Sequence, residues 1–166
     1  MNRNIYLIGF MGVGKSTIGR LLSKEMKGQL IEMDETIEKE QGMTINEIFA
    51  RYGETHFRDL ESKLVERIAG EEGKIVSCGG GAVLRPLNVE NMKKSGIIVF
   101  LSATPETIYK RVRHSTNRPL LNGNMNVEYI AGMMEKRRSL YESAADVTIS
   151  TDKKTTVEIV KEILQK

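Results

Sequence analysis

Two hydrophobic patterns alternate along this chain. Short runs of apolar residues, rich in β-branched and aromatic side chains, predict strands. These runs occupy residues 4–10, 29–33, 75–78, 96–101 and 147–149. Longer segments, in which apolar residues recur every three or four positions, predict helices. These segments occupy residues 18–26, 44–52, 56–69, 104–113 and 127–141, with a last helix after residue 155. Strands that alternate with helices predict a parallel sheet covered by helices on both faces.

Local signals mark several boundaries of these elements. Thr44 and Glu47 have the spacing of a capping box, and so do Thr155 and Glu158. Residues 114–126 are polar and contain proline, glycine and several asparagines, so they predict an exposed loop.

Length and composition narrow the range of functions. The chain has 166 residues, which suits a single domain spanning residues 1–166. A net charge of +3, few aromatic residues and no Trp argue against nucleic acid as a partner. No apolar run approaches the length of a membrane span and no secretory signal is evident, so we expect a cytoplasmic protein without a membrane partner. The single cysteine, Cys78, excludes an internal disulfide and is expected to be a small buried residue.

The segment GFMGVGKS at residues 9–16 carries the clearest chemistry, because it matches the phosphate-loop pattern G-x-x-x-x-G-K-[ST]. Glycines let the backbone wrap closely, so that successive N–H groups point at phosphate oxygens. Lys15 supplies a charge for the β- and γ-phosphates, and the Ser16 hydroxyl can ligate Mg²⁺. A strand before the loop and a helix after it are the context that the motif requires. The predicted ATP-binding residues in this segment are Gly12, Val13, Gly14, Lys15, Ser16 and Thr17.

Other candidate residues follow predicted strands, and in parallel sheets ligands bind beyond the carboxyl ends of strands. Glu32 and Asp34 are two apart on a strand and would face the same side. One could position Mg²⁺ and the other accept a hydroxyl proton; alternatively, both cap the next helix and complement its dipole. Three glycines at residues 79–81 predict close approach of the main chain to a ligand, with a simple turn as the alternative.

Four arginines are candidates for binding anions, because the guanidinium fork pairs with carboxylate or phosphate. They are Arg58, Arg111, Arg118 and Arg137. A loop arginine such as Arg118 can also close over a transferring phosphoryl group. The alternative for each is a solvated surface position, and spacing alone does not single these four out among 25 basic residues.

Taken together, these motifs resemble those of the shikimate kinase family. The matching segments are GFMGVGKST at residues 9–17, MDETIE at 33–38, GMTINEIF at 42–49, GETHFRDLE at 53–61, VSCGGGAV at 76–83, RPLL at 118–121 and KRRSLY at 136–141. Their order and spacing agree over nearly the whole chain. The phosphate loop is shared with many kinases, whereas the combination of FRxxE, GGG, RPLL and KRxxLY is far more specific.

The resemblance implies a three-layer α/β P-loop kinase fold with a five-stranded parallel sheet. Substrate-binding helices would lie at about residues 34–62 and a lid loop at about 114–126. The implied reaction is ATP- and Mg²⁺-dependent transfer of the γ-phosphoryl group to the 3-hydroxyl of shikimate, giving shikimate 3-phosphate and ADP. This step belongs to the pathway that leads to chorismate and aromatic amino acids. One Mg²⁺ per active site and a monomeric enzyme are expected.

The resemblance also implies roles in substrate binding. Arg58 and Arg137 would hold the shikimate carboxylate. Asp34 would bind the ring hydroxyls as the candidate base, and Gly80 would donate its backbone N–H to the substrate. Phe49 would form a wall of the substrate pocket, together with Phe57.

On the donor side, Lys15 and Arg118 would complete the catalytic set with Asp34, and Arg118 would reach the phosphates of ATP. Arg111 occupies the position that packs on adenine in this family. Glu32 is a departure, because many relatives carry Asp there to hold Mg²⁺ through water, and the longer side chain shifts that geometry. Two alternatives stay open: a kinase for another small polyol or nucleotide, and a non-catalytic member that binds ATP or shikimate.

Overall fold

Five parallel strands form the centre of the computed structural model, which describes residues 3–114 and 125–166. The strands are β1 (Asn4–Ile8), β2 (Gln29–Glu32), β3 (Lys74–Ser77), β4 (Gly96–Ser102) and β5 (Val147–Ser150). Their order in the sheet is β2-β3-β1-β4-β5, and every neighbouring pair is parallel. The chain order reverses at β1, which lies between β3 and β4. In open parallel sheets such a reversal opens a crevice for ligands at the carboxyl ends of the strands.

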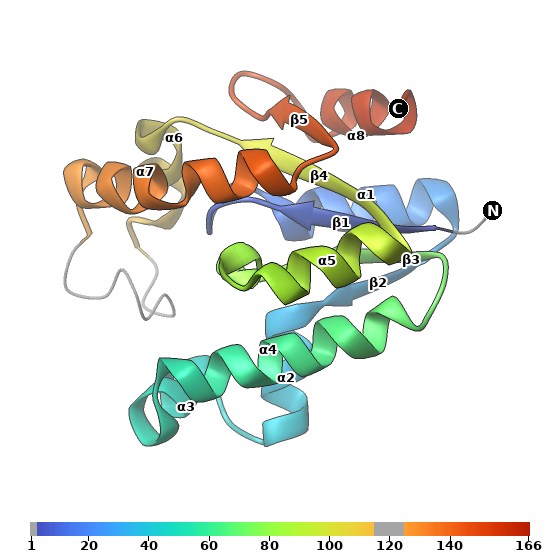
Figure 1. Ribbon diagram of the computed structural model, residues 1–166. Helices are drawn as coiled ribbons and strands as arrows, with labels where there is room; N and C mark the ends of the chain where they lie inside the picture. The colour runs from blue at the N-terminus through green and yellow to red at the C-terminus, as the bar shows by residue number, and fades with distance from the viewer. Residues whose placement is uncertain (1–2, 115–124) are drawn as a thin grey trace.

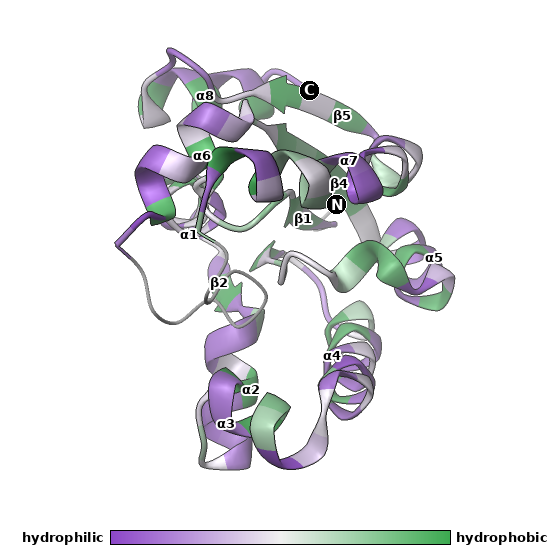
Figure 2. Cartoon of the chain, turned by 90° about the vertical axis from the view of Figure 1, so that its left-hand side faces the viewer, coloured by the Kyte–Doolittle hydropathy of each residue, from purple (hydrophilic) through white to green (hydrophobic). Residues whose placement is uncertain are grey.

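Helices cover both faces of this sheet, which gives three layers (Figure 1). The helices are α1 (Lys15–Met26), α2 (Met33–Gln41), α3 (Ile45–Tyr52), α4 (Glu54–Ala69), α5 (Pro86–Ser95), α6 (Pro105–Val112), α7 (Val127–Ala144) and α8 (Thr156–Leu164), with a short 3₁₀ turn, η1 (Ala82–Leu84). Helices α2, α3 and α4 form a group beside β2 that extends away from the rest of the sheet (Figure 2). Among the described residues, no helix has both the length and the apolar character needed to cross a membrane.

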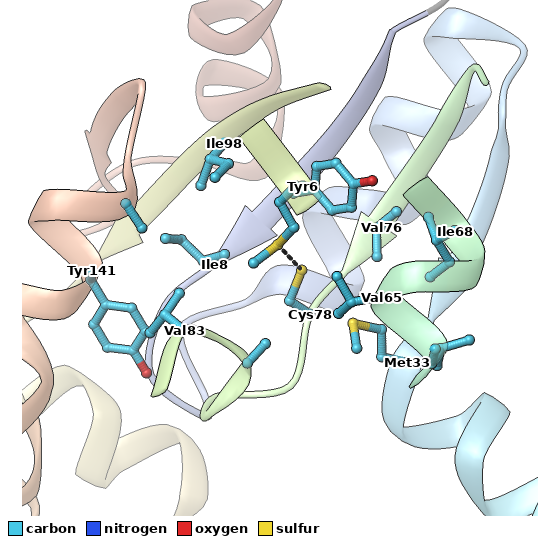
Figure 3. Packing of buried hydrophobic residues seen from close by; sticks show 14 of the residues in the cluster. Tyr6, Ile8, Met33, Val65, Ile68, Val76, Cys78, Val83, Ile98 and Tyr141 are labelled. Carbon is cyan, nitrogen blue, oxygen red and sulfur yellow. Dashed lines mark hydrogen bonds between the residues drawn. The ribbon is translucent and has the colours of Figure 1, made fainter. Parts of the chain in front are cut away.

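The sheet is buried on both faces, so successive strand residues belong to different cores. Tyr6 and Ile8 pack with α4, α5 and α7 in one cluster, whereas Leu7 between them packs with α1, α6 and α8 in the other. Figure 3 shows the first cluster, in which Cys78 Sγ lies 3.9 Å from Met92 Sδ. Cys78 is 2% exposed, and burial raises the pKa of its thiol, so it behaves as the small buried residue expected from the sequence.

The predicted fold class and strand pattern are confirmed, although several element bounds differ. Strand β1 ends at Ile8, two residues before the expected end at residue 10. Strand β2 ends at Glu32, and Met33 already begins α2, so the expected strand is one residue too long. Helix α5 was not predicted, because only Asn88 and Met92 of its residues are buried, and two positions make too weak a periodic signal. The two expected capping boxes are both present, at the starts of α3 and α8.

Two glycines offer a direct test of this packing. Gly132 lies in α7, and a Cβ added there would meet nothing within 4 Å. We expect Gly132→Ala to raise the unfolding free energy by about 0.5–1 kcal/mol, because alanine loses less backbone entropy in a helix. Gly96 starts β4, and a Cβ there would lie 2.2 Å from the Asn4 carbonyl oxygen of the neighbouring strand. Gly96→Ala should therefore lower the unfolding free energy. Urea denaturation measures both changes. A destabilised Gly132→Ala or a stabilised Gly96→Ala would contradict the described packing.

Candidate active site

The phosphate loop joins β1 to α1 and curls tightly against its neighbours. Gly9 and Gly12 have φ values of +148° and +83°, which other residues rarely adopt. A Cβ on Gly9 would lie 2.4 Å from the Leu101 carbonyl oxygen, so only glycine fits between the loop and β4. Lys15 is 8% exposed, and its Nζ donates to the carbonyl oxygens of Gly9 at 2.6 Å and Phe10 at 3.1 Å. The lysine charge is thus held inside the curve of the loop.

A cavity of about 520 Å³ lies against this loop. The predicted ATP-binding residues that line it are Gly12, Gly14, Lys15, Ser16, Thr17 and Arg111. Val13 points away and is buried in the core. Arg111 Nη1 donates to the Val13 carbonyl oxygen at 2.8 Å, so its exposed guanidinium is tied to the loop from α6. The structure therefore brings Arg111, distant in sequence, to the predicted donor site.

A second cavity, of about 420 Å³, adjoins the first, and its lining includes Asp34, Phe49, Phe57, Arg58, Glu61, Gly79, Gly80, Gly81 and Arg137. The residues common to both cavities are Met11, Asp34, Glu38, Gly79 and Gly80. All the predicted acceptor-site residues line this second cavity. Asp34 and Gly80 therefore border both the cavity at the phosphate loop and the cavity with the predicted acceptor-site residues.

The second cavity carries two buried arginines from different helices. Arg58 on α4 is 8% exposed, and Arg137 on α7 is 7% exposed. Arg58 Nη1 donates to Glu61 Oε1 at 3.0 Å, and its Nη2 donates to Glu54 Oε2 at 3.2 Å. Arg137 Nη1 is buried without a hydrogen-bond partner among the described residues. A buried guanidinium N–H without an acceptor is costly, so this side of the cavity favours an anionic ligand.

Two of the three consecutive glycines, Gly79 and Gly81, lie too close to charged side chains to carry a Cβ, whereas Gly80 does not. A Cβ on Gly79 would lie 2.6 Å from Glu61 Oε2 and 2.8 Å from Asp34 Oδ1. A Cβ on Gly81 would lie 2.4–2.6 Å from three guanidinium atoms of Arg58. The main chain therefore approaches the charged side chains of the site closely, in the region where the sequence predicted close approach to a ligand.

Glu61 lines the second cavity, although the sequence pattern does not indicate a place for it in the site. Its side chain is fully buried in α4, and Oε2 has no hydrogen-bond partner among the described residues. Burial raises the pKa of the Glu61 carboxyl to about 7, although the charge of Arg58 works in the opposite direction. The available signal was its position three residues after Arg58, which places both on one helix face.

Glu32 and Asp34 both reach the first cavity, but the reason expected from strand alternation is wrong. Glu32 is the residue before α2, and Asp34 lies in the first turn of that helix, so the two are not strand neighbours. The alternative interpretation is confirmed only in part: Asp34 lies in the first turn and complements the helix dipole, whereas Glu32 occupies the N-cap position but makes no side-chain capping hydrogen bond. The helix start also presents Asp34 to both cavities, so a contribution to the helix dipole is compatible with a place in the site.

The oxygen atoms near Ser16 suit a hard cation such as Mg²⁺. Ser16 Oγ lies 3.5 Å from Ser77 Oγ at the end of β3, and Ser77 pairs in register with Glu32 on β2. Glu32 Oε1 is buried without a hydrogen-bond partner in the described part of the chain. No group of three or more His, Cys, Asp or Glu among residues 3–114 and 125–166 could hold a metal. A cation here would accordingly take most of its ligands from phosphate oxygens and water, as Mg²⁺ commonly does.

Arg118, and with it most of the expected lid at residues 114–126, lies outside the described residues. His114, at the edge of that segment, is exposed.

The phosphate loop after β1, the strand order and the two joined cavities define an α/β phosphate-loop kinase. The sequence model of the shikimate kinase family matches residues 11–166. The chain belongs to the shikimate kinase family.

Individual relatives agree with this assignment. A shikimate kinase of Persephonella marina is 43% identical over 162 residues, which cover 98% of this chain and 97% of the relative. A solved shikimate kinase from Acinetobacter baumannii, in complex with shikimate, has a TM-score of 0.95 and 33% identity, covering 99% of this chain and 92% of that one. A shikimate kinase structure from Aquifex aeolicus has a TM-score of 0.85 and 36% identity, covering 98% and 94% of the two chains.

The raised pKa of Glu61 predicts a pH-dependent stability. Between pH 4.5 and about 7, the folded state keeps the Glu61 proton that the unfolded chain has lost. The contribution of this bound proton to the stability of the fold is complete below pH 4.5 and is lost as the pH rises through about 7. The unfolding free energy of the wild type, relative to Glu61→Gln, should therefore fall across this range in urea titrations. Glu66→Gln, at an exposed position of the same helix, is the control; equal pH profiles for the wild type and Glu61→Gln would contradict the prediction.

Proposed function

We propose that this chain transfers the γ-phosphoryl group of ATP to the 3-hydroxyl of shikimate, giving shikimate 3-phosphate and ADP. The observation that carries the proposal is a phosphate-loop cavity joined to a cavity with two buried arginines, in a member of the shikimate kinase family. Shikimate is a small ring acid with three hydroxyls, so its binding needs cations for the carboxylate and oxygen acceptors for the hydroxyls. The second cavity offers both kinds of group.

Arg58 and Arg137 are the proposed partners of the shikimate carboxylate. Their guanidinium groups enter the cavity from two helices, so a carboxylate between them would be held from two directions. The buried Nη1 of Arg137 would gain an acceptor on binding. Glu54 and Glu61 hold Arg58 in place from its own helix, which reduces the ordering cost of substrate binding.

Asp34 is the proposed partner of the reacting hydroxyl, because it lines both cavities. In the proposed step, the 3-hydroxyl oxygen forms a bond to the γ-phosphorus while the bond from that phosphorus to the β,γ-bridging oxygen breaks. The hydroxyl proton passes to Asp34, and ADP leaves with the electron pair of the broken bond. Gly80 would donate its N–H to a substrate hydroxyl and so orient the ring.

Lys15 and the phosphate loop are the proposed donor-side machinery. Residues 12–17 would hold the phosphates with backbone N–H groups, and Lys15 would leave the loop carbonyls to pair with the β- and γ-phosphates. Arg111 would pack against adenine from α6. Arg118, on the proposed lid at residues 114–126, would add positive charge to the phosphoryl group and help exclude water.

Mg²⁺ is the proposed metal, one ion per site. When bound with ATP, it neutralises charge on the β- and γ-phosphates. The Ser16 hydroxyl would be its protein ligand, and the Glu32 carboxylate lies on the neighbouring strand end, within the same cavity. The hydroxyl and carboxylate oxygens near this point fit the preference of Mg²⁺ for hard ligands.

We further propose that residues 1–166 form one kinase domain that acts as a monomer. Apart from Val13, the proposed donor and acceptor residues within the described part line two adjoining cavities of this one fold, so the proposed site needs no residue of a second copy. The proposed need for ATP and the lack of an internal disulfide in a chain with one cysteine suit the cytoplasm.

The proposed reaction can be tested with a coupled assay of ADP release. Shikimate should stimulate ADP release well above the rate in buffer, and gluconate or a nucleoside monophosphate should not. Asp34→Asn keeps the shape of the side chain and loses its charge, so turnover should fall by at least about 100-fold. A folded wild-type enzyme that releases no more ADP with shikimate than with buffer would overturn the proposal, and near-normal rates for Asp34→Asn would remove the base role.

Arg137→Ala tests the carboxylate site. The variant should raise the KM for shikimate by about 10- to 100-fold, because a charged hydrogen bond to the substrate is lost, while the KM for ATP stays near the wild-type value. The matched control is Arg138→Ala on the same helix, where the arginine is 63% exposed and pairs with Glu135. Equal shikimate KM values for the two variants would rule out the role of Arg137.

A further inference from the structure

Residues 79–81 form a glycine turn, and its three carbonyl groups are anchored in two different ways. The Gly79 carbonyl oxygen accepts a hydrogen bond from the Ala82 N–H at 3.0 Å, and that of Gly81 accepts one from the Leu84 N–H at 3.0 Å. Both bonds come from η1 and are available to any sequence in this backbone conformation. The Gly80 carbonyl oxygen accepts from the Tyr141 hydroxyl on α7. The central peptide of the turn thus depends on a side chain from a distant helix.

Tyr141 is held firmly enough to act as such an anchor. Its side chain is 3% exposed, and its ring stacks on Phe100 of β4, with the ring centres 5.1 Å apart. Figure 3 shows the ring extending from α7, with its hydroxyl directed toward the segment that leads to Val83. Burial raises the pKa of the Tyr141 hydroxyl, and the charge of Arg137 opposes that change only in part. The hydroxyl therefore keeps its proton at neutral pH and remains a donor.

The same helix also supplies Arg137, one turn before Tyr141. Residues four apart lie on one helix face, so both side chains point to the glycine turn. A Cβ on Gly80 would lie 3.5 Å from Arg137 Nη1, which shows how closely this arginine approaches the turn. Helix α7 thus places a proposed carboxylate-binding group and the anchor of Gly80 side by side.

We propose that Tyr141 is a positioning residue for the acceptor site. Its hydroxyl fixes the Gly80–Gly81 peptide. The Gly80 N–H belongs to the preceding Gly79–Gly80 peptide, which Ala82 already holds, so Tyr141 limits rotation about Gly80 and thereby helps to orient the N–H that would meet a shikimate hydroxyl. Three consecutive glycines have little intrinsic preference for one conformation, so a fixed central carbonyl removes freedom that substrate binding would otherwise have to remove. This inference rests on the proposed function of Gly80.

Tyr141→Phe removes only the hydroxyl and keeps the ring that stacks on Phe100. The KM for shikimate should rise about 10-fold, the loss expected for one poorly oriented hydrogen bond, with the KM for ATP within about two-fold of the wild type. The matched control is Tyr6→Phe. The Tyr6 hydroxyl is also buried and bonded, to Ser95 and Asn4, in the same apolar cluster but away from the cavity lining. Tyr6→Phe should lower stability and leave the KM for shikimate unchanged.

A second measurement separates this inference from the proposed reaction. Amide hydrogen exchange of the peptide covering residues 79–84 should be faster in Tyr141→Phe than in the wild type and in Tyr6→Phe, whether or not shikimate is the substrate. If Tyr141→Phe exchanged in that peptide at the wild-type rate, or were active with an unchanged KM for shikimate, the positioning role would be overturned. A wild-type enzyme inactive toward shikimate, with faster exchange in Tyr141→Phe, would instead count against the proposed reaction alone.

A double variant distinguishes action through Gly80 from action through Arg137. If Tyr141 works through Gly80, Tyr141→Phe should raise the KM for shikimate by the same factor in an Arg137→Lys background as in the wild type. If Tyr141→Phe does not raise the KM for shikimate further in the Arg137→Lys background, the proposal that Tyr141 acts through Gly80 is overturned.

Discussion

Buried charge is the constraint on which the acceptor side of this structure depends. Arg58, Glu61 and Arg137 are each less than 10% exposed, and such groups are costly to remove from water unless they have partners. Arg58 has two glutamates, whereas Glu61 and Arg137 each retain a polar atom without a partner in the described chain. The compensation within the protein is incomplete, and a bound carboxylate with hydroxyls could supply what is missing.

The sheet brings these charges to the phosphate loop. All five strands are parallel, so the segments after β1, β2 and β3 emerge at one edge. The segment after β1 is the phosphate loop, that after β2 carries Asp34, and that after β3 is the glycine turn. Helices α4 and α7 then bring Arg58 and Arg137 to the same edge from opposite sides of that turn. The tight fit of Gly79 against Glu61 and of Gly81 against Arg58 shows that the glycine turn and α4 are closely packed.

Much of this arrangement could be predicted from the sequence, for identifiable reasons. The buried strands are continuous apolar runs, and the phosphate loop has a sequence that few other functions require. The position of Asp34 was anticipated, although the helix start, and not a strand end, places it there. The arginines could be chosen only through family resemblance, because their spacing does not set them apart from other basic residues. Glu61 and Tyr141 were not assigned, since their importance arises from contacts across the fold that no local pattern records.

The shared lining of the two cavities has a consequence for ligand design. Because Met11, Asp34 and Gly80 border both spaces, a nucleotide phosphate and a ring acid would lie close together. A single compound that joins the two through a short linker would bind as a bisubstrate ligand, with the second half held at high effective concentration once the first is seated. Its selectivity for this enzyme over other phosphate-loop kinases would come from the half that contacts the buried arginines, because the nucleotide half binds a motif that many proteins share.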